Sequence, residues 1–458
     1  MFQEITGPYI VMVGACLLYL LFSITSGWRA FVGWVVFLSV QLPLNSETIR
    51  PAISDLFIPF AFLAWVFAGN KRAEISERQG RSQLLPWILV FTALFFGVGN
   101  TIAYIHLGYI PIWTIVNKDI GLITLVMMFA LSEYYIRDKE RLFSLIRYFI
   151  YTGFAINAVA LCGGIARYAL GINNPMMRDT TGLRLVGFNI NPGSFGGWLI
   201  VIILIQLSLL LGQSKIIGMR RSLQWANLIV GCLDMVMTLS RSSYLGFSAG
   251  LFAVIFLSKK GSAKNIIVIG TLVLLSMTYL FRHSQNSDLD EQFQSSVYRS
   301  DTAEQRVTMN ETAISLFFES PVNIPFGIGI GTFLMRSAEL LGHYNQIHNT
   351  FLWILVEMGA CGFVVMLMIF YRAYADCRTA SRLNWSGRPL AIGVIASIIG
   401  SLGWFMGDEG LWHRHIWFVF ILADAVYRIY LQEIDFKRLV EGSGGHPEFT
   451  GNPAFVAR

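Results

Sequence analysis

The stretch GWLIVIILIQLSLLLGQ, residues 197–213, contains no charged side chain. An uninterrupted apolar run of this length is typical of a helix that crosses a lipid bilayer. Similar segments recur along the whole chain and predict an all-α, polytopic transmembrane helix bundle of about 12–13 spans. The number of spans is left at 12 or 13 because the second and third candidate spans are short. The candidate spans are 8–25, 29–43, 55–69, 84–105, 119–136, 143–163, 197–213, 223–240, 243–258, 264–282, 349–371, 389–406 and 414–431.

Composition supports the same class. Of the 458 residues, 55% are hydrophobic and only 14% are charged, and the mean hydropathy is +0.57. Soluble domains carry about 25% charged residues, so a soluble enzyme, a disordered chain and a nucleic-acid binder are excluded. The net charge of +6 is expected to reflect basic loops beside anionic lipid rather than a nucleic-acid partner. The five cysteines form no CxxC pair, so neither a disulfide framework nor a metal site is indicated.

The distribution of lysine and arginine predicts the orientation of the bundle. From about residue 70 onward, basic residues gather in every second connection, in the segments 71–81, 137–147, 215–221, 259–264, 372–388 and 428–438. Cytoplasmic loops of membrane proteins carry such an excess. The sequence therefore predicts that these connections are cytoplasmic and that the others face the outer side.

The basic residues predicted on the outer side are nearly all arginines. It holds eleven of the 34 lysines and arginines, and ten of the eleven are arginines. Six of the seven histidines also fall there. A guanidinium group is a planar fork that binds phosphate or carboxylate through two hydrogen bonds. The pattern favours a binding site for an anionic group on the outer face over a chance distribution.

Two outer connections are long, about 164–196 and about 283–348. Loops without secondary structure rarely exceed about 12–15 residues unless they are functional or disordered. In the second loop, the segment 300–320 is expected to form an amphipathic helix that ends before Pro321. Gly327, Gly329 and Gly331 follow. Because no Lys-Ser/Thr comes after them and no strand before them, they predict a tight, close-packed turn rather than a phosphate-binding loop.

Arginines stand close to the ends of two predicted spans. Asp234 and Arg241 are seven residues apart, or two helical turns, so an internal carboxylate is expected beneath an arginine at the outer boundary. The alternative is an arginine that only reaches lipid headgroups. Arg184 precedes Asn191-Pro192, a turn directly before a span, so this arginine is expected near the membrane surface.

Further polar residues mark the starts of two other spans. His348 and Asn349 stand where the span 349–371 begins, and a polar cap or interfacial anchor is the alternative to a functional role. Glu357 lies about 13 Å deeper; a carboxylate inside a membrane must be protonated, paired or hydrogen-bonded, and a structural role is expected. The segment 408–415, with an acidic pair and two histidines, is interpreted as a satisfied polar turn rather than a site.

Taken in order, these motifs resemble the O-antigen ligase and polymerase superfamily of bacterial membrane glycosyltransferases. The ordered set is Arg…Asn-Pro at 184–192, Leu-Ser-Arg at 239–241, an outer helix with Arg306, Pro-Phe-Gly-x-Gly at 325–329 and His-Asn…Glu-x-Gly-x-x-Gly at 348–362. The resemblance covers mainly residues 180–370, and the hydropathy of the remainder agrees with it.

The resemblance implies a transfer reaction at the periplasmic face of the bacterial inner membrane. The donor would be a glycan on undecaprenyl pyrophosphate, and the acceptor a hydroxyl of another glycan or of the lipid A core. By position, Arg184, Arg241 and Arg306 would bind the pyrophosphate, Arg241, Arg306 and His348 would be catalytic, and Asn191, Asn349, Asp234 and Glu357 would support them. No metal or other cofactor is implied. Besides the bilayer, a chain-length regulator protein is an expected partner.

The chemistry agrees with this assignment. A pyrophosphate-linked sugar carries its own leaving group, so the enzyme mainly has to stabilise the departing negative charge, which arginines do without a metal. An imidazole with a pKa near 6.5 can accept the proton of the attacking hydroxyl. Attack opposite the phosphate would invert the anomeric centre.

Two questions stay open at the level of sequence. The first is whether the protein is instead a transporter or flippase of lipid-linked glycan, although the sequence shows no matched pair of broken spans in its two halves. The second is whether the enzyme is a ligase or a polymerase, which the sequence does not decide. The expected organisation is transmembrane helices over 1–163, a ligase/polymerase-like core over 164–371 with the periplasmic loop 283–348, C-terminal transmembrane helices over 372–438 and a disordered cytoplasmic tail over 439–458.

Overall fold

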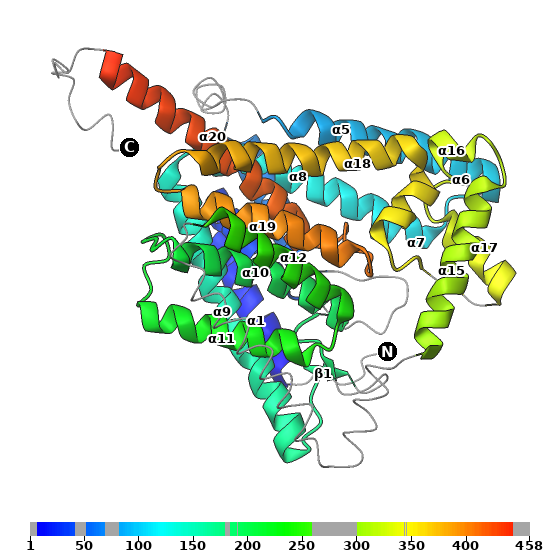
Figure 1. Cartoon of the computed structure of the whole chain (residues 1–458), viewed down its shortest axis with the longest axis horizontal. Coiled ribbons are helices and arrows are strands. Elements are labelled where there is room, and N and C mark those ends of the chain that lie inside the picture. Colours follow the sequence, from blue (N-terminus) through cyan, green and yellow to red (C-terminus); the bar gives the residue numbers. More distant parts are fainter. Residues whose placement is uncertain are drawn as a thin grey trace.

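The computed structural model describes residues 7–41, 52–68, 82–178, 184–189, 191–258, 300–342, 344 and 346–442. Within these ranges the chain is almost entirely helical, and most long helices run roughly side by side (Figure 1). The first half contains α1 (Gly7–Ser23), α2 (Gly27–Val36), η1 (Ile53–Phe57), α3 (Ile58–Val66), α5 (Leu85–Ala93), η2 (Leu94–Gly99), α6 (Asn100–Leu107), α7 (Ile112–Thr114), η3 (Ile115–Asp119), α8 (Ile120–Tyr135) and α9 (Lys139–Leu170).

The second half begins with a short antiparallel pair, β1 (Met177–Arg178) and β2 (Arg184–Leu185). Its helices are α10 (Pro192–Leu211), α11 (Arg221–Met237), α12 (Arg241–Leu257), α15 (Ser300–Phe318), α16 (Asn323–Phe326), α17 (Thr332–Leu341), α18 (Thr350–Arg382), α19 (Arg388–Phe405) and α20 (Arg414–Gly442). Helices α15 and α17 cross one end of the bundle instead of running along it (Figure 1).

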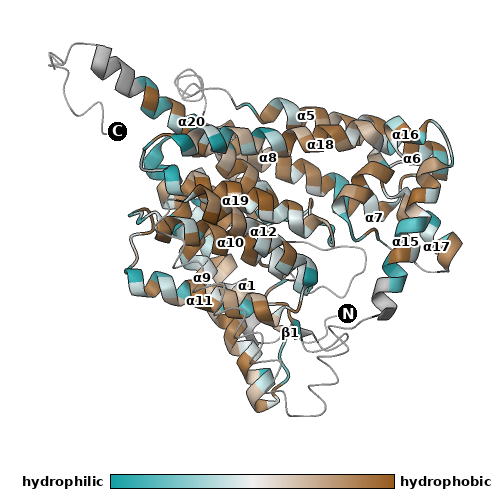
Figure 2. Ribbon diagram, in the orientation of Figure 1, coloured by the Kyte–Doolittle hydropathy of each residue, from teal (hydrophilic) through white to brown (hydrophobic). Residues whose placement is uncertain are grey.

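The prediction of an all-α polytopic bundle is confirmed. Among the described residues, six helical stretches are long and apolar enough to cross a membrane, and three apolar helices are shorter. Each predicted span except 264–282 falls on a helix, and that span and the loop residues 283–299 lie outside the described residues. Apolar residues dominate the parallel helices, whereas α15 carries polar residues along much of its length (Figure 2). The predicted amphipathic outer helix is present as α15, and it ends at Phe318, before Pro321.

Helix α10 is the centre of the bundle. Nearly all of its apolar stretch is buried, because α9, α11, α12, α19 and α20 all pack against it. Asn191 caps its start, where the side-chain oxygen accepts a hydrogen bond from the backbone N–H of Ser194 at 2.7 Å, and Pro192 occupies the first turn. Both features favour a helix that begins at this point.

Helices α12 and α19 touch through their backbones. At Gly246 there is no room for a Cβ beside the carbonyl oxygen of Gly400, and a Cβ at Gly250 would lie 2.8 Å from the carbonyl oxygen of Ala396. Lipid tails give helices no hydrophobic reason to associate, so small residues that allow close backbone contact drive their packing.

The glycine-rich segment after α16 packs against α18, as the predicted close-packed turn. The backbone N–H of Ile328 donates to the carbonyl of Val356 at 2.8 Å, and Gly329 donates to that of Glu357 at 3.1 Å. Gly359 has φ +68° inside α18, and backbone atoms of Pro325 leave no room for a Cβ there. The α18 kink and the turn therefore fit each other through glycines on both sides.

One expectation about the helix ends is wrong. Asp234 and Arg241 do not lie along one helix, because α11 ends at Met237 and Arg241 is the first residue of α12. The chain reverses between them through Leu239, whose φ is +47°. At the other end of the chain, α20 continues to Gly442, and residues 443–458 of the expected tail lie outside the described residues.

Candidate active site

Arg241 stands at the start of α12, directly after the turn of residues 238–240. Ser240 caps this helix by accepting a hydrogen bond from Ser243. Arg184, on β2, stabilises the turn through two hydrogen bonds. Its Nε donates to the carbonyl of Thr238 at 3.0 Å, and its Nη2 donates to the carbonyl of Leu239 at 3.1 Å. Arg184 therefore fixes the position from which Arg241 extends.

Arg306 reaches the same region from α15. Loss of surrounding water is the main cause that lowers the pKa of its guanidinium, the positive charge of Arg241 lowers it further, and the carboxylate of Asp408 opposes the change. An arginine nevertheless stays charged at any physiological pH. Two cations are thus held near each other, with one carboxylate as a partial counter-charge.

His348 precedes Asn349, the cap of α18, whose side chain accepts a hydrogen bond from Leu352 at 3.1 Å. Loss of water lowers the pKa of His348, Arg306 lowers it further, and Glu409 raises it. The imidazole is therefore neutral at pH 7 and able to accept a proton. These electrostatic couplings connect His348, Arg306 and Arg241, which come from three separate helices or helix starts.

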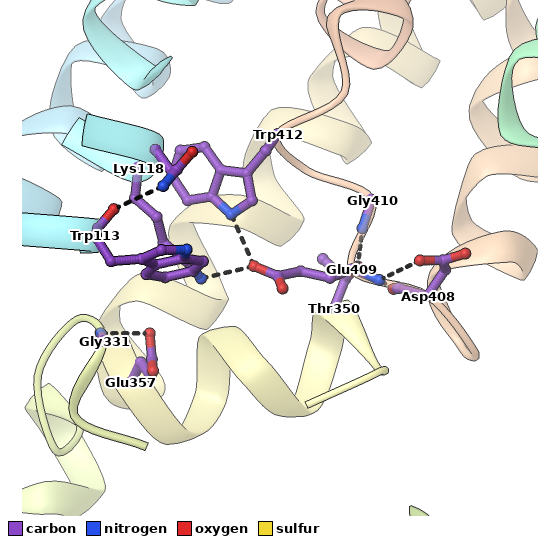
Figure 3. Close-up of polar contacts among 10 residues, drawn as sticks. Trp113, Lys118, Gly331, Thr350, Glu357, Asp408, Glu409, Gly410 and Trp412 are labelled. Carbon is purple, nitrogen blue, oxygen red and sulfur yellow. Dashed lines mark hydrogen bonds and ion pairs between the residues drawn. The ribbon is translucent and has the colours of Figure 1, made fainter. Parts of the chain in front are cut away.

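The turn between α19 and α20 completes the polar cluster (Figure 3). The hydroxyl of Thr350 donates to the carbonyl of Asp408 at 2.7 Å and accepts from the N–H of Gly410 at 2.8 Å, which ties the start of α18 to this turn. Burial raises the pKa of the Asp408 carboxyl to about 6, and Glu409 contributes to the increase, whereas the Glu409 N–H and Arg306 oppose it. Its carboxylate lies against Gly193 in the first turn of α10.

Glu409 forms a nearly buried ion pair with Lys118 in η3. The Lys118 Nζ and the Glu409 Oε1 are 2.6 Å apart, and the two side chains are only 4% and 11% exposed. Trp412 donates a hydrogen bond to the same oxygen at 3.1 Å, and the ammonium lies 4.0 Å from the centre of the Trp353 ring. Figure 3 shows this pair beside the Asp408 turn.

Of the remaining predicted residues, three form hydrogen bonds that support the fold and one is buried without a hydrogen-bond partner among the described residues. Glu357 is buried in α18 and accepts a hydrogen bond from the N–H of Gly331 at 3.0 Å, in agreement with the structural role expected for it. Asn191 and Asn349 are helix caps. Asp234 is fully buried in α11, and neither carboxylate oxygen has a hydrogen-bond partner among the described residues.

Sequence reasoning did not select Lys118, Asp408 and Glu409 as site residues. It interpreted the segment 408–415 as a satisfied polar turn. Residues 408–410 are indeed hydrogen-bonded, but the buried Nε2 of His415 has no hydrogen-bond partner among the described residues. The turn also lies beside His348 and Arg306. Two adjacent carboxylates in the connection between two predicted spans were the available signal. Within the described residues, no group of three or more His, Cys, Asp or Glu side chains is placed to hold a metal ion.

The fold and this cluster define a multi-pass helical membrane protein with arginines, a neutral histidine and carboxylates gathered at one end of the bundle. Residues 226–367 match the O-antigen ligase family, which confirms the resemblance of this part of the chain to the O-antigen ligase and polymerase superfamily. The match supports a membrane glycosyltransferase activity of the ligase/polymerase type. No curated protein matches the chain.

The matched segment contains Arg241, Arg306 and His348, together with Asp234, Asn349 and Glu357. Arg184 and Asn191 precede it, and Lys118, Asp408 and Glu409 also lie outside it. The polar cluster is thus built partly from the family segment and partly from residues that only the fold brings to it.

Proposed function

We propose that the protein transfers a glycan from undecaprenyl pyrophosphate to an acceptor hydroxyl at the periplasmic face of the bacterial inner membrane. The observation that carries the proposal is the pair Arg241 and Arg306. Two guanidinium groups held close together repel each other, and Asp408 compensates only one positive charge. A bound diphosphate would remove this repulsion and accept hydrogen bonds from both forks.

In the proposed reaction, the acceptor oxygen attacks the anomeric carbon of the donor glycan. A new carbon–oxygen bond forms as the bond between that carbon and the phosphate oxygen breaks, and undecaprenyl pyrophosphate leaves with the electron pair. Arg241 and Arg306 stabilise the negative charge that develops on the leaving group. Arg184 acts through the turn that it holds, so it is a positioning residue in this scheme.

His348 is proposed to receive the hydroxyl proton on an imidazole nitrogen. A lowered pKa keeps the ring neutral at pH 7, which is the state that general-base catalysis requires. Attack from the face opposite the phosphate gives inversion at the anomeric carbon. The scheme uses no metal, because the two guanidinium groups supply the positive charge.

The test is transfer by the purified full-length chain in lipid nanodiscs with a lipid-linked oligosaccharide and a glycan acceptor. We expect Arg241→Gln, Arg306→Gln and His348→Ala each to lower the rate by about 10²-fold or more. Arg336→Gln is the matched control, since Arg336 also lies on a helix of the outer loop but is engaged with Glu319 and Glu339. Full transfer by the first three variants would refute the assignment.

A second measurement distinguishes a polymerase from a ligase, and both from a transporter of lipid-linked glycan. If the protein is a polymerase, deletion in cells leaves single repeats and removes long chains. If it is a ligase, long chains accumulate on the carrier. A transporter of lipid-linked glycan would instead move the donor across vesicle membranes without forming a glycosidic bond.

A further inference from the structure

A second polar region lies at the opposite end of the bundle. A cavity of about 900 Å³ opens where α10 ends and where α11 and α19 begin, beside the first half of α9. Asp408 contacts the first turn of α10, whereas Leu211 and Gly212 line this cavity at the other end of the same helix. A helix of 20 residues is about 30 Å long. The cavity is therefore separate from the candidate active site.

The charged residues that line the cavity are all basic. They are Arg147, Lys215, Arg221 and Arg388, and no acidic residue is among the lining residues that the structure describes. None of the four forms an ion pair with another residue in the part of the chain that the structure describes. The Nε of Arg388 donates to the carbonyl of Ser381 at 2.9 Å, which holds this guanidinium at the wall.

Two helices begin at the cavity, and their dipoles add to the positive charge. Arg221 and Arg388 are the first residues of α11 and α19, and the preceding residues, Arg220 and Gly387, provide no side-chain cap. Helix N-termini favour anions through their unpaired N–H groups and the helix dipole. Four cations that form no ion pair with the described residues, together with two helix starts around one cavity, indicate an anionic ligand.

The remaining wall is largely apolar. Phe143, Leu211, Trp385 and Ile392 line it, and the Trp385 indole is fixed by a hydrogen bond to the carbonyl of Ala380 at 2.7 Å. A ligand that satisfies both walls has a phosphate group and a hydrocarbon part. Basic pockets between membrane helices on the cytoplasmic side are suited to acidic phospholipid headgroups, and the volume lies within the range of small-molecule sites.

We propose that this cavity binds a phosphate-bearing anion, and that an anionic phospholipid of the cytoplasmic leaflet supplies it. The lysine and arginine bias assigns this end of the bundle to the cytoplasm. A soluble phosphate compound is the other source of the same chemistry. The inference does not depend on the proposed transfer reaction, since it concerns the opposite end of the bundle.

The experiment titrates the purified full-length chain in detergent with fluorescent phosphatidylglycerol and, separately, with fluorescent phosphatidylcholine. We expect tighter binding of phosphatidylglycerol, and a loss of about tenfold or more in its affinity for the double variant Arg221→Gln/Arg388→Gln. The matched control, Arg137→Gln/Arg378→Gln, removes the same charge from basic residues that do not line the cavity. It should bind as the wild type does.

A second variant keeps the proposal testable if the double variant does not fold. Ser386→Trp fills the cavity without changing its charge, and it should also weaken phosphatidylglycerol binding. Competition by inorganic pyrophosphate that fully displaces the lipid would assign the same site to soluble phosphate compounds. Equal loss in the cavity variants and the control, or equal affinity for the two lipids with no displacement by pyrophosphate, would overturn the proposal.

Discussion

His348, Arg306 and Glu409 form a set of charges in which each neighbour changes the proton affinity of the histidine. Arg306 and the loss of water lower the pKa of His348, and Glu409 raises it. Because a general base must be unprotonated, the activity should fall only when the pH drops through this lowered pKa. The acidic limb of the pH–rate profile is therefore expected below 6.5, the ordinary value for histidine.

Removal of the Arg306 charge should move that limb in a defined direction. Arg306→Gln takes away a cation that lowers the pKa of His348, so the limb of the residual activity should move to higher pH. Arg306→Lys keeps the charge and should leave the limb in place while lowering the rate. The measurement is kcat/KM against pH for both variants. An unchanged limb in Arg306→Gln would show that His348 is not the titrating base.

The ion pair of Lys118 and Glu409 should matter for stability as well as for position. Glu409→Gln leaves a nearly buried ammonium without its counter-charge, which typically costs about 3–5 kcal/mol. The double variant Lys118→Met/Glu409→Gln removes both charges and should recover most of that loss. Unfolding in detergent, followed by temperature and by denaturant, measures it. A double variant as unstable as Glu409→Gln would mean that the tryptophans, rather than the charge pair, maintain this region.

The kinked helix α18 positions several residues of the candidate active site. His348 and Asn349 precede its first turn, and Thr350 ties it to the Asp408 turn. The kink at Gly359 packs against the glycine-rich segment that follows α16. Helix α15 carries Arg306 and packs against α18. The kink therefore couples the position of Arg306 to that of His348.

Gly359→Ala tests this coupling. Its backbone conformation, φ +68° and ψ −172°, is open essentially only to glycine, and the new methyl group would also meet the backbone of Pro325. We expect a loss of at least about 2 kcal/mol in unfolding free energy and a lower transfer rate. Gly342→Ala is the control: it also has a positive φ, but no atom lies within 4 Å of its added Cβ. It should lose only about 1 kcal/mol. Equal losses would exclude a role for the close contact.

Hydropathy predicted the helices well, because a span is a local property of some twenty adjacent residues. It separated the spans 223–240 and 243–258 but placed the reversal too late: α11 already ends at Met237, and neither glycine nor proline marks the turn in which Leu239 adopts a positive φ. The ion pair of Lys118 and Glu409 could not be predicted from the sequence either. These residues are distant in sequence, and only the packing of α18 and α20 against the earlier helices brings them together.

At the scale of the molecule, the two ends of the bundle differ in their charge chemistry. One end combines arginines with carboxylates and a neutral histidine, and many of these groups are paired or coupled. The other end presents four basic side chains around a cavity whose described lining contains no acidic residue. Cytoplasmic ends of membrane proteins collect lysine and arginine beside anionic lipid, so this asymmetry predicts which end faces the cytoplasm.

That orientation can be measured by single cysteines in a cysteine-free variant of the full chain. Glu339→Cys places an accessible thiol on α17, at the end of the candidate active site, because the Glu339 side chain is 68% exposed. Ser386→Cys places one at the mouth of the cavity. In intact cells that have a permeable outer membrane, a membrane-impermeant maleimide should label Cys at position 339 and not at position 386, and inside-out vesicles should give the reverse. Labelling of position 386 in intact cells would place the basic cavity outside, and the arginine site could then no longer meet a periplasmic donor.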